Sequence, residues 1–212
     1  GDTGGGHGHA DKLHIDLVLG GEDVLTDSGR YTYVDGSARY FLKEPGAHNV
    51  VLVDERSYSV CQDSWVYQNL CSCMKQQYFD GKKGSFVEGS HMGYLKEGVL
   101  TNRRIIWIKP DIYVLADYFY AAGLHSYESL FHFGGQGRLS LCGNIPEEGP
   151  VHFEGKKIHA WLQSVSGGGK CEVIRTQISH HYNQIAENPS LVICSEAEGD
   201  FHRILVINGG KK

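Results

Sequence analysis

The chain has 212 residues, of which 41% are hydrophobic and 21% charged, and these shares exclude a wholly disordered protein. Its 28 glycines make up about 13% of the residues, against roughly 7% in average proteins, and clusters of them mark turns. The formal net charge of -5 excludes a global basic field that would attract nucleic acid, and no apolar run reaches the ~20 residues that a membrane span needs.

Apolar residues alternate with a period of two far more often than with a period of 3.6, which predicts strands. In chain order, the predicted strands cover residues 13–19, 49–53, 104–109, 111–120, 126–133, 191–194 and 201–207. Pro110 joins two of them in a hairpin or tight corner, and the turn-rich residues 198–200 link the last two as a closing pair. Helical signal is limited to one or two turns within 63–77. We therefore predict a single all-β domain, an antiparallel β-sandwich with little helix.

The start of the chain carries the sharpest chemical signal, because His7 and His9 are separated by one glycine. On an extended chain, residues two apart face the same side, so both imidazoles point the same way. Asp27 ends a short apolar stretch, and His48 stands just before the next predicted strand. Three short strands paired side by side would bring His9, Asp27 and His48 together. Two histidines and a carboxylate with an open fourth position are typical of a zinc site.

Other interpretations of these histidines remain open at this point. The carboxylate would also suit manganese or iron, and the histidines could simply be hydrogen-bonded side chains of a surface or cleft. A cupin-like metalloenzyme is a further alternative, since cupin metal motifs also begin with HxH. That motif needs a glutamate a few residues on, and only Asp11 and Asp16 follow here.

Several segments taken together point to a known family. Near the start these are HGHADKL (7–13), LTDSGRYTY (25–33), ARYF (38–41) and GAHNVVLVD (46–54). Further on come GSHMGYLKEGVLTNRRIIWIKPDIYVLADYF (89–119) and ESLFHF (128–133). Together they resemble the C-terminal β-sandwich domain of the heparinase II/III-like and oligoalginate lyases. The resemblance covers most of the chain.

The resemblance implies a β-elimination on a uronate-containing glycan, such as alginate or a heparin or heparan-type chain. It implies that His9, Asp27 and His48 hold a divalent metal, most often zinc, and that His7 projects into the cleft and is catalytic. It places His91 of the HMGY segment at the cleft wall. The other catalytic residues of the family, a tyrosine among them, lie in an N-terminal (α/α) toroid domain that these residues do not contain.

The implied reaction sets further requirements. The uronate carboxylate must be neutralised, a base must take the proton at carbon 5, and an acid must protonate the leaving oxygen. His7 can act as the base or as a donor to the carboxylate, because histidine titrates near working pH. We expect Arg30 and Arg39 to contact a carboxylate or sulfate of the substrate, since the net charge has the wrong sign for a polyanion. The adjacent Arg103 and Arg104 instead suggest strand-edge charges.

These inferences define the expected role of the chain. It opens at Gly1 on its most chemical segment, so we expect a part of a longer protein whose toroid domain is missing, and little or no activity from this part alone. The expected partners are an acidic polysaccharide or oligosaccharide and that toroid, with neither nucleic acid nor membrane. The alternative is a non-catalytic carbohydrate-binding or scaffold domain. The substrates of the family favour a periplasmic or secreted protein, whereas six cysteines without a CxxC pair mildly favour the cytoplasm.

Overall fold

The computed structural model describes residues 7–135, 137–143 and 149–211, and for Lys75 the backbone alone. The glycines at 4–6 of the opening motif therefore lie outside the described residues. The helical elements are α1 (Ser37–Lys43) and the short 3-10 turns η1 (Pro45–Ala47) and η2 (Leu95–Glu97). The strands are β1 (Leu17–Leu19), β2 (Glu22–Leu25), β3 (Val51–Val53), β4 (Cys73–Asp80), β5 (Gly84–His91), β6 (Val99–Ile108), β7 (Ile112–Ala121), β8 (Leu124–His132), β9 (Arg138–Leu141), β10 (Val151–Glu154), β11 (Ile158–Ser166), β12 (Lys170–His181), β13 (Gln184–Glu198) and β14 (Phe201–Lys211).

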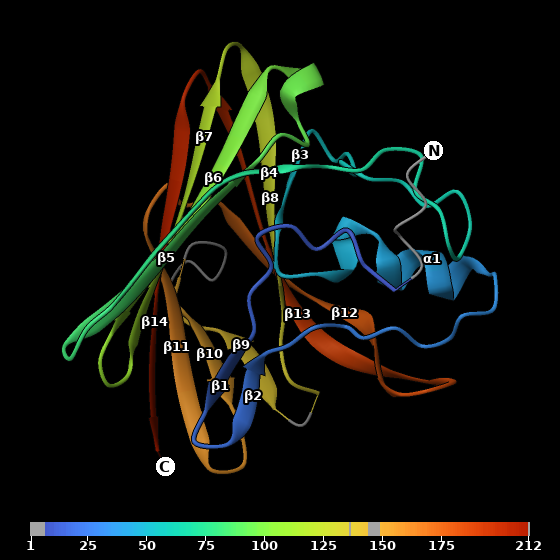
Figure 1. Ribbon diagram of the computed structural model, residues 1–212. Coiled ribbons are helices and arrows are strands. Elements are labelled where there is room, and N and C mark those ends of the chain that lie inside the picture. Colours follow the sequence, from blue (N-terminus) through green and yellow to red (C-terminus); the bar gives the residue numbers. More distant parts are fainter. Residues whose placement is uncertain (1–6, 136, 144–148, 212) are drawn as a thin grey trace.

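The strands form two packed sheets and one small hairpin (Figure 1). The larger sheet has eight strands in the order β4-β5-β6-β7-β14-β11-β10-β9, and the smaller has four in the order β12-β13-β8-β3. β1 and β2 form a separate two-stranded hairpin, and an isolated bridge joins Leu25 of β2 to Phe133. All ladders between these strands are antiparallel. The predicted all-β antiparallel sandwich is confirmed.

The core lies between the two sheets, where every second residue of a strand points inward. Leu115 and Leu205 come from the larger sheet, Phe131 and Leu191 from the smaller, and all four are at most 2% exposed. Burial of such side chains contributes about 25 cal/mol per Å² of apolar surface. This core fixes how the two sheets face each other.

Most predicted strands are present. Residues 49–53 contain β3, residues 104–120 lie within the β6–β7 hairpin, and residues 126–133 lie in β8 apart from the last. Only 17–19 of the predicted strand 13–19 is a strand, because the preceding residues turn toward the smaller sheet, where His14 accepts a hydrogen bond from the backbone of Asn49 at 2.9 Å. The prediction of a strand here is therefore correct, but the predicted strand begins too early.

The predicted pairing of the last two strands is wrong. β13 pairs with β12 and β8, whereas β14 pairs with β7 and β11. The link between them crosses from one sheet to the other. Leu191 of β13 and Leu205 of β14 thus face the same core from opposite sides. Two apolar strands joined by a short turn can bury their side chains in either way, and the sequence pattern does not distinguish the two.

The prediction of helix within 63–77 is also wrong. Asp63 accepts hydrogen bonds from the backbone of Trp65 and Val66, which makes a tight turn, and from Cys73 onward the chain forms β4. The helix lies instead at Ser37–Lys43. Its buried face includes Arg39 and Lys43, so hydrophobic periodicity could not reveal it.

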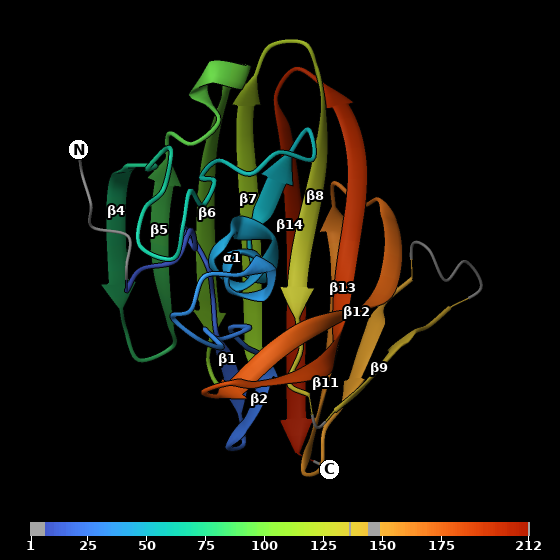
Figure 2. The same ribbon diagram turned by 90° about the vertical axis from the view of Figure 1, so that its right-hand side faces the viewer.

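Loops and α1 cover the outer side of the smaller sheet. Figures 1 and 2 show α1 and the segments around it on the side of β3, β8 and β13 that faces away from the larger sheet. No disulfide joins the six cysteines, which all lie in the described part of the chain. Within the described residues, no helix has both the length and the apolar character to cross a membrane.

The pair Arg103 and Arg104 does not mark a sheet edge, since β6 lies between β5 and β7. Neighbouring residues of a strand point to opposite faces, so the two arginines have different environments. Arg103 is 3% exposed and bonds to Asp117 at 2.6 and 3.0 Å. Arg104 lies on the outer face and pairs with Glu88 at 3.2 Å. The expectation of strand-edge charges is wrong for both.

Candidate metal centre

Three loops bring His9, Asp27 and His48 together. His9 lies in the irregular segment before β1, Asp27 lies just after β2, and His48 follows η1 directly. One potential ligand atom from each residue lies within 4.8 Å of the others. The sequence predicted this juxtaposition but assigned it to three paired strands, and that assignment is wrong because all three residues lie outside strands.

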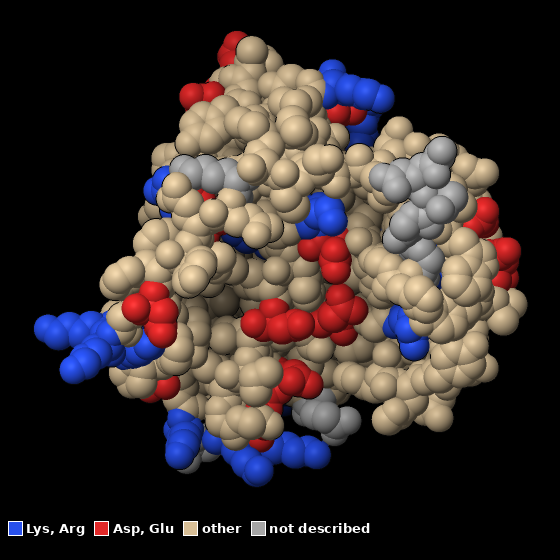
Figure 3. Space-filling model, in the orientation of Figure 1, with Lys and Arg blue, Asp and Glu red and all other residues tan. Residues whose placement is uncertain are grey.

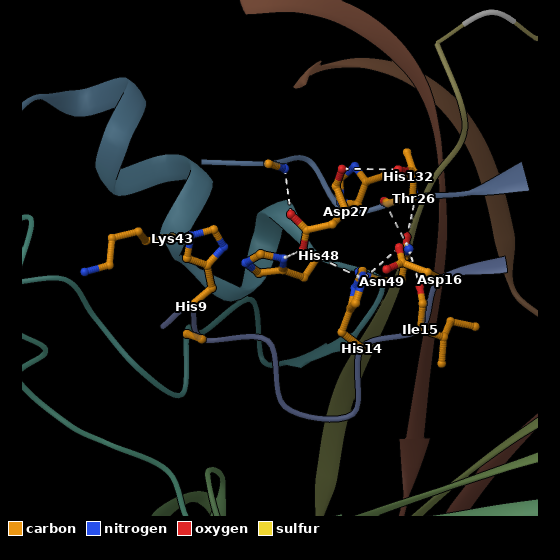
Figure 4. Close-up of polar contacts among 12 residues, drawn as sticks. His9, His14, Ile15, Asp16, Thr26, Asp27, Lys43, His48, Asn49 and His132 are labelled. Atoms are coloured by element: carbon orange, nitrogen blue, oxygen red, sulfur yellow. Dashed lines mark hydrogen bonds and ion pairs between the residues drawn. The ribbon is translucent and has the colours of Figure 1, made fainter. Parts of the chain in front are cut away.

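Hydrogen bonds fix the orientation of His48 and Asp27 (Figure 4). The Nδ1 of His48 donates to Oδ2 of Asp27 at 2.8 Å, and Oδ1 of Asp27 accepts from the backbone of Gly29 at 2.6 Å. Gly29 has a positive φ of 78°, and a Cβ there would lie 2.2 Å from the carbonyl oxygen of Ser179. This turn therefore requires glycine, which explains the Asp-Ser-Gly pattern.

The second nitrogen of His48 carries the strongest sign of a ligand site. The residue is 0% exposed, and its Nε2 has no hydrogen-bond partner in the described part of the chain. A buried polar atom without a partner costs about 1–3 kcal/mol. Because Nδ1 carries the proton donated to Asp27, Nε2 presents a lone pair. Figure 4 shows the ring of His48 between Asp27 and His9, whose ring centroid is 5.2 Å away.

The protonation states also suit a cation. Burial, and next the neighbouring His48, lowers the pKa of His9 to about 4. Burial raises the pKa of Asp27, but the hydrogen bonds from His48 and from the backbone of Gly29 lower it to about 2. At neutral pH His9 therefore offers a neutral imidazole nitrogen and Asp27 an ionised carboxylate. Two nitrogens and one oxygen are donors that a transition-type divalent metal accepts, so these three residues could hold such an ion.

Asn49 connects the loops behind the triad, and sequence analysis missed it. Its side-chain amide donates to the carbonyls of Ile15 at 2.7 Å and Thr26 at 3.2 Å, and accepts from the backbone of His132 at 2.6 Å. Its own backbone donates to His14 at 2.9 Å. These bonds tie the segments before β1 and after β2 to β8. The sequence feature that could have revealed Asn49 is its position directly after His48. There the fully buried amide holds the loop that carries a candidate metal ligand.

Arg39 contacts His9 of the triad, and His7 and Arg30 meet at a neighbouring tyrosine. Arg39 of α1 is fully buried, and its guanidinium lies 3.4 Å from Nε2 of His9 and 3.4 Å from the carbonyl of Arg30. Burial lowers the pKa of Arg39. His7 and Arg30 are exposed and meet at Tyr33, whose hydroxyl lies 3.0 Å from Nδ1 of His7 and accepts a hydrogen bond from Arg30.

His91 lies apart from this group. It is 3% exposed and packs against Tyr58 and Tyr94, with ring centroids 4.7 and 5.8 Å away. Its Nδ1 accepts from the backbone of Gly93 at 3.1 Å, and burial lowers its pKa to about 3. Tyr58 in turn donates to the carbonyl of Ala10 at 2.6 Å, so His91 supports the histidine-bearing loop from behind.

The charged side chains of this face are unevenly distributed. Figure 3 shows several acidic side chains beside a hollow in the middle of the face and basic side chains mainly at its margins. One basic group, Lys82 and Lys83, lies in the turn between β4 and β5. Asp16 and Asp27 lie 3.2 and 3.8 Å from Nε2 of His14, next to the triad. Carboxylates beside the triad favour a cation there.

The family model described as heparinase II/III-like, C-terminal, matches residues 1–206. The chain belongs to this family. No curated protein matches it significantly. The resemblance inferred from the sequence motifs is therefore confirmed, and the cupin alternative no longer has support.

Several solved lyase structures share the fold of this chain. Heparan sulfate lyase HepC from Pedobacter heparinus superposes with a TM-score of 0.80 and 11% identity, over 97% of this chain and 31% of that one. A heparinase III gene product gives 0.77 and 14%, over 96% and 31%. Another heparinase III gives 0.73 and 14%, over 95% and 30%. This chain thus spans about a third of the lyases that it matches.

Proposed function

We propose that this chain is the β-sandwich part of a polysaccharide lyase that cleaves uronate-containing glycans by β-elimination. The observation that carries the proposal is the triad of His9, Asp27 and His48, with its unpartnered Nε2, next to the exposed His7 and Arg30. Family membership and the fold shared with heparan sulfate lyases support the reaction class. The remaining catalytic groups belong to a toroid domain outside these residues.

We propose zinc as the ion of the triad, because two imidazoles and a carboxylate are a zinc-type set. When bound, a divalent ion would cross-link the three loops and add positive charge beside the uronate. His48 donates to Asp27 and thereby orients both ligands. Asn49 holds the loops that carry His9 and Asp27 through the carbonyls of their neighbours.

The residues of this chain divide the elimination as follows. His7 takes the proton from carbon 5; where His7 instead donates to the uronate carboxylate, a base outside these residues takes that proton. In both cases Arg30 pairs with the carboxylate and stabilises the enolate-like charge. The carbon 5–hydrogen electrons form the double bond to carbon 4, and the bond from carbon 4 to the glycosidic oxygen breaks. An acid outside these residues protonates the leaving oxygen. Tyr33 holds His7 by its hydroxyl at 3.0 Å.

The direct test uses the longer protein that carries this domain. In H7A, we expect kcat/KM for formation of the unsaturated uronate product to fall about 10²–10⁴-fold. H180A is the matched control, because His180 is exposed on β12 and contacts none of the triad residues. Full activity of H7A, or equal losses in H7A and H180A, would contradict the proposal. A domain that binds glycan but is dispensable for elimination would instead be a carbohydrate-binding module.

A further inference from the structure

A stacked pair of aromatic rings, one exposed and one half-buried, lies beside His7. The rings of Tyr33 and Trp65 are stacked, with centroids 5.5 Å apart and planes 6° apart. His7 meets both rings edge-on, at 5.4 Å from Tyr33 and 6.2 Å from Trp65. Trp65 is 48% exposed although Tyr33 covers one face of its indole. We call Tyr33 and Trp65 the aromatic shelf; so large an exposed apolar area next to a polar site points to a ligand.

The turn that carries Trp65 is firmly held. Oδ1 of Asp63 accepts from the backbone of Trp65 at 2.7 Å and of Val66 at 2.9 Å. The buried Lys43 of α1 donates to the carbonyl of Ser64 at 2.8 Å. The indole is therefore positioned before any ligand arrives, and a preorganised ring loses less conformational entropy on binding.

A positive charge accompanies the shelf. The guanidinium carbon of Arg30 lies 4.3 Å from the ring centroid of Tyr33. Arg30 is exposed, and no salt bridge joins it to a carboxylate in the part of the chain that the structure describes. An exposed cation near the exposed indole of Trp65 complements a ligand that is flat, partly apolar and negatively charged.

We propose that Trp65 forms a stacking subsite for one pyranose ring of an acidic oligosaccharide, with Arg30 pairing the carboxylate or sulfate of that sugar. The axial C–H face of a pyranose is apolar and packs on an indole, while its hydroxyls stay in water. The proposal deepens the proposed function and rests on it for the class of sugar. Because His7 meets the edge of both rings and Arg30 lies over Tyr33, the stacked sugar is the same uronate whose carboxylate Arg30 pairs in the elimination.

The test is a binding titration of this chain with two acidic tetrasaccharides, one of glucuronate and N-acetylglucosamine and one of mannuronate. Calorimetry gives the Kd, and the indole N–H resonance of Trp65 reports local contact. We expect W65A to weaken binding of the preferred tetrasaccharide about tenfold and W65F to restore part of it. R30A should weaken binding of the acidic ligand and leave that of neutral cellotetraose unchanged.

W161A is the matched control. Trp161 is 41% exposed and also stacks on a neighbour, His152, at 4.2 Å, but it lies on β11 in the larger sheet. Its removal should change the Kd less than twofold. Equal effects of W65A and W161A, or no binding of either acidic tetrasaccharide by the unaltered chain, would overturn the subsite whatever the elimination assay gives. Binding that depends on Trp65, together with an active H7A enzyme, would overturn the lyase role and leave the subsite standing.

Discussion

At the residue scale, ionisable side chains show how burial and partners decide chemistry. His48 and His91 are both buried histidines, at 0% and 3% exposure. The Nδ1 of His91 accepts a hydrogen bond from Gly93, whereas Nε2 of His48 has no partner in the described part of the chain. A buried histidine whose ring nitrogen has a hydrogen-bond partner, such as His91, therefore has a structural role. A buried lone pair directed at other ligand groups makes a candidate metal ligand.

His91 makes a prediction about pH. Its pKa is about 3 in the folded chain and near 6.5 when unfolded, so between these values the unfolded chain binds the extra proton. Its contribution to stability is complete above pH 6.5 and falls by about 1.4 kcal/mol for each pH unit below it. In H91N, the amide oxygen can still accept the hydrogen bond from Gly93, but the side chain no longer binds a proton in this pH range.

Urea unfolding at pH 7, 6 and 5 checks this. The free energy of unfolding of H91N should depend on pH less steeply than that of the unaltered chain, by about one bound proton. Other buried groups, such as His132, add to the slope of both proteins and cancel in the difference. Equal slopes would show that His91 takes up its proton without unfolding.

At the element scale, the β6–β7 hairpin joins the candidate metal centre to the larger sheet. Arg103 of β6 bonds to Asp117 of β7 and also donates to the carbonyls of Leu13 at 2.7 Å and Asn49 at 2.5 Å. The two carbonyls belong to the segments that carry His14 and His48. The hairpin thus supports the loops of the triad through one buried guanidinium.

Substitution of the two adjacent arginines tests this support. R103M leaves Asp117 charged and buried without its partner, so we expect a loss of about 3–5 kcal/mol in the free energy of unfolding. R104M removes an ion pair whose arginine is 44% exposed, and the buried Glu88 keeps a hydrogen bond from Asn102 at 3.0 Å, so only about 0–1 kcal/mol should be lost. Denaturant unfolding of both variants measures the difference. Similar losses would mean that Arg103 is not a structural support of the site.

The elements also show how far sequence reasoning reaches. Alternating apolar residues predicted β3, β8 and the β6–β7 hairpin, because one face of each strand must enter the core. The same pattern could not assign β13 and β14 to different sheets, since both arrangements bury the same residues. It also missed α1, whose buried face includes the charged side chains of Arg39 and Lys43.

The part of the candidate site that the sequence predicts is the one in which a sequence motif also carries metal-ligand chemistry. His9, Asp27 and His48 stand out as a ligand set in the sequence, and the structure brings them together. The aromatic shelf was not predictable, because Tyr33 and Trp65 are 32 positions apart and meet only through the turn at Asp63. Asn49 was missed for a similar reason, since its partners come from three separate segments.

At the scale of the whole molecule, the site lies on an outer face formed largely by loops. Ligands from three loops that share no ladder can be held together by one ion, so a bound ion should stabilise the entire sandwich by mass action. Chelation should therefore lower the Tm of the unaltered chain by several degrees, and re-addition of zinc should restore it. H48A, which lacks a ligand, should show no such shift on chelation.

Elimination should require more than this domain. The acid for the leaving oxygen is assigned outside these residues, so we expect no unsaturated product from this chain alone and full activity from the longer protein. The spectrophotometric assay for the unsaturated uronate product compares the two at equal concentration. Activity of the isolated chain at the level of the longer protein would show that its own residues supply the acid.

We propose that His9, Asp27 and His48 form a metal centre, and elemental analysis of the purified chain measures this directly. Prepared without chelator, the unaltered chain should carry about one divalent ion, with zinc expected. H9A and D27A should lose it, and H180A should retain it. A metal-free chain that stays metal-free in the presence of zinc, or undiminished metal in H9A and D27A, would contradict the account.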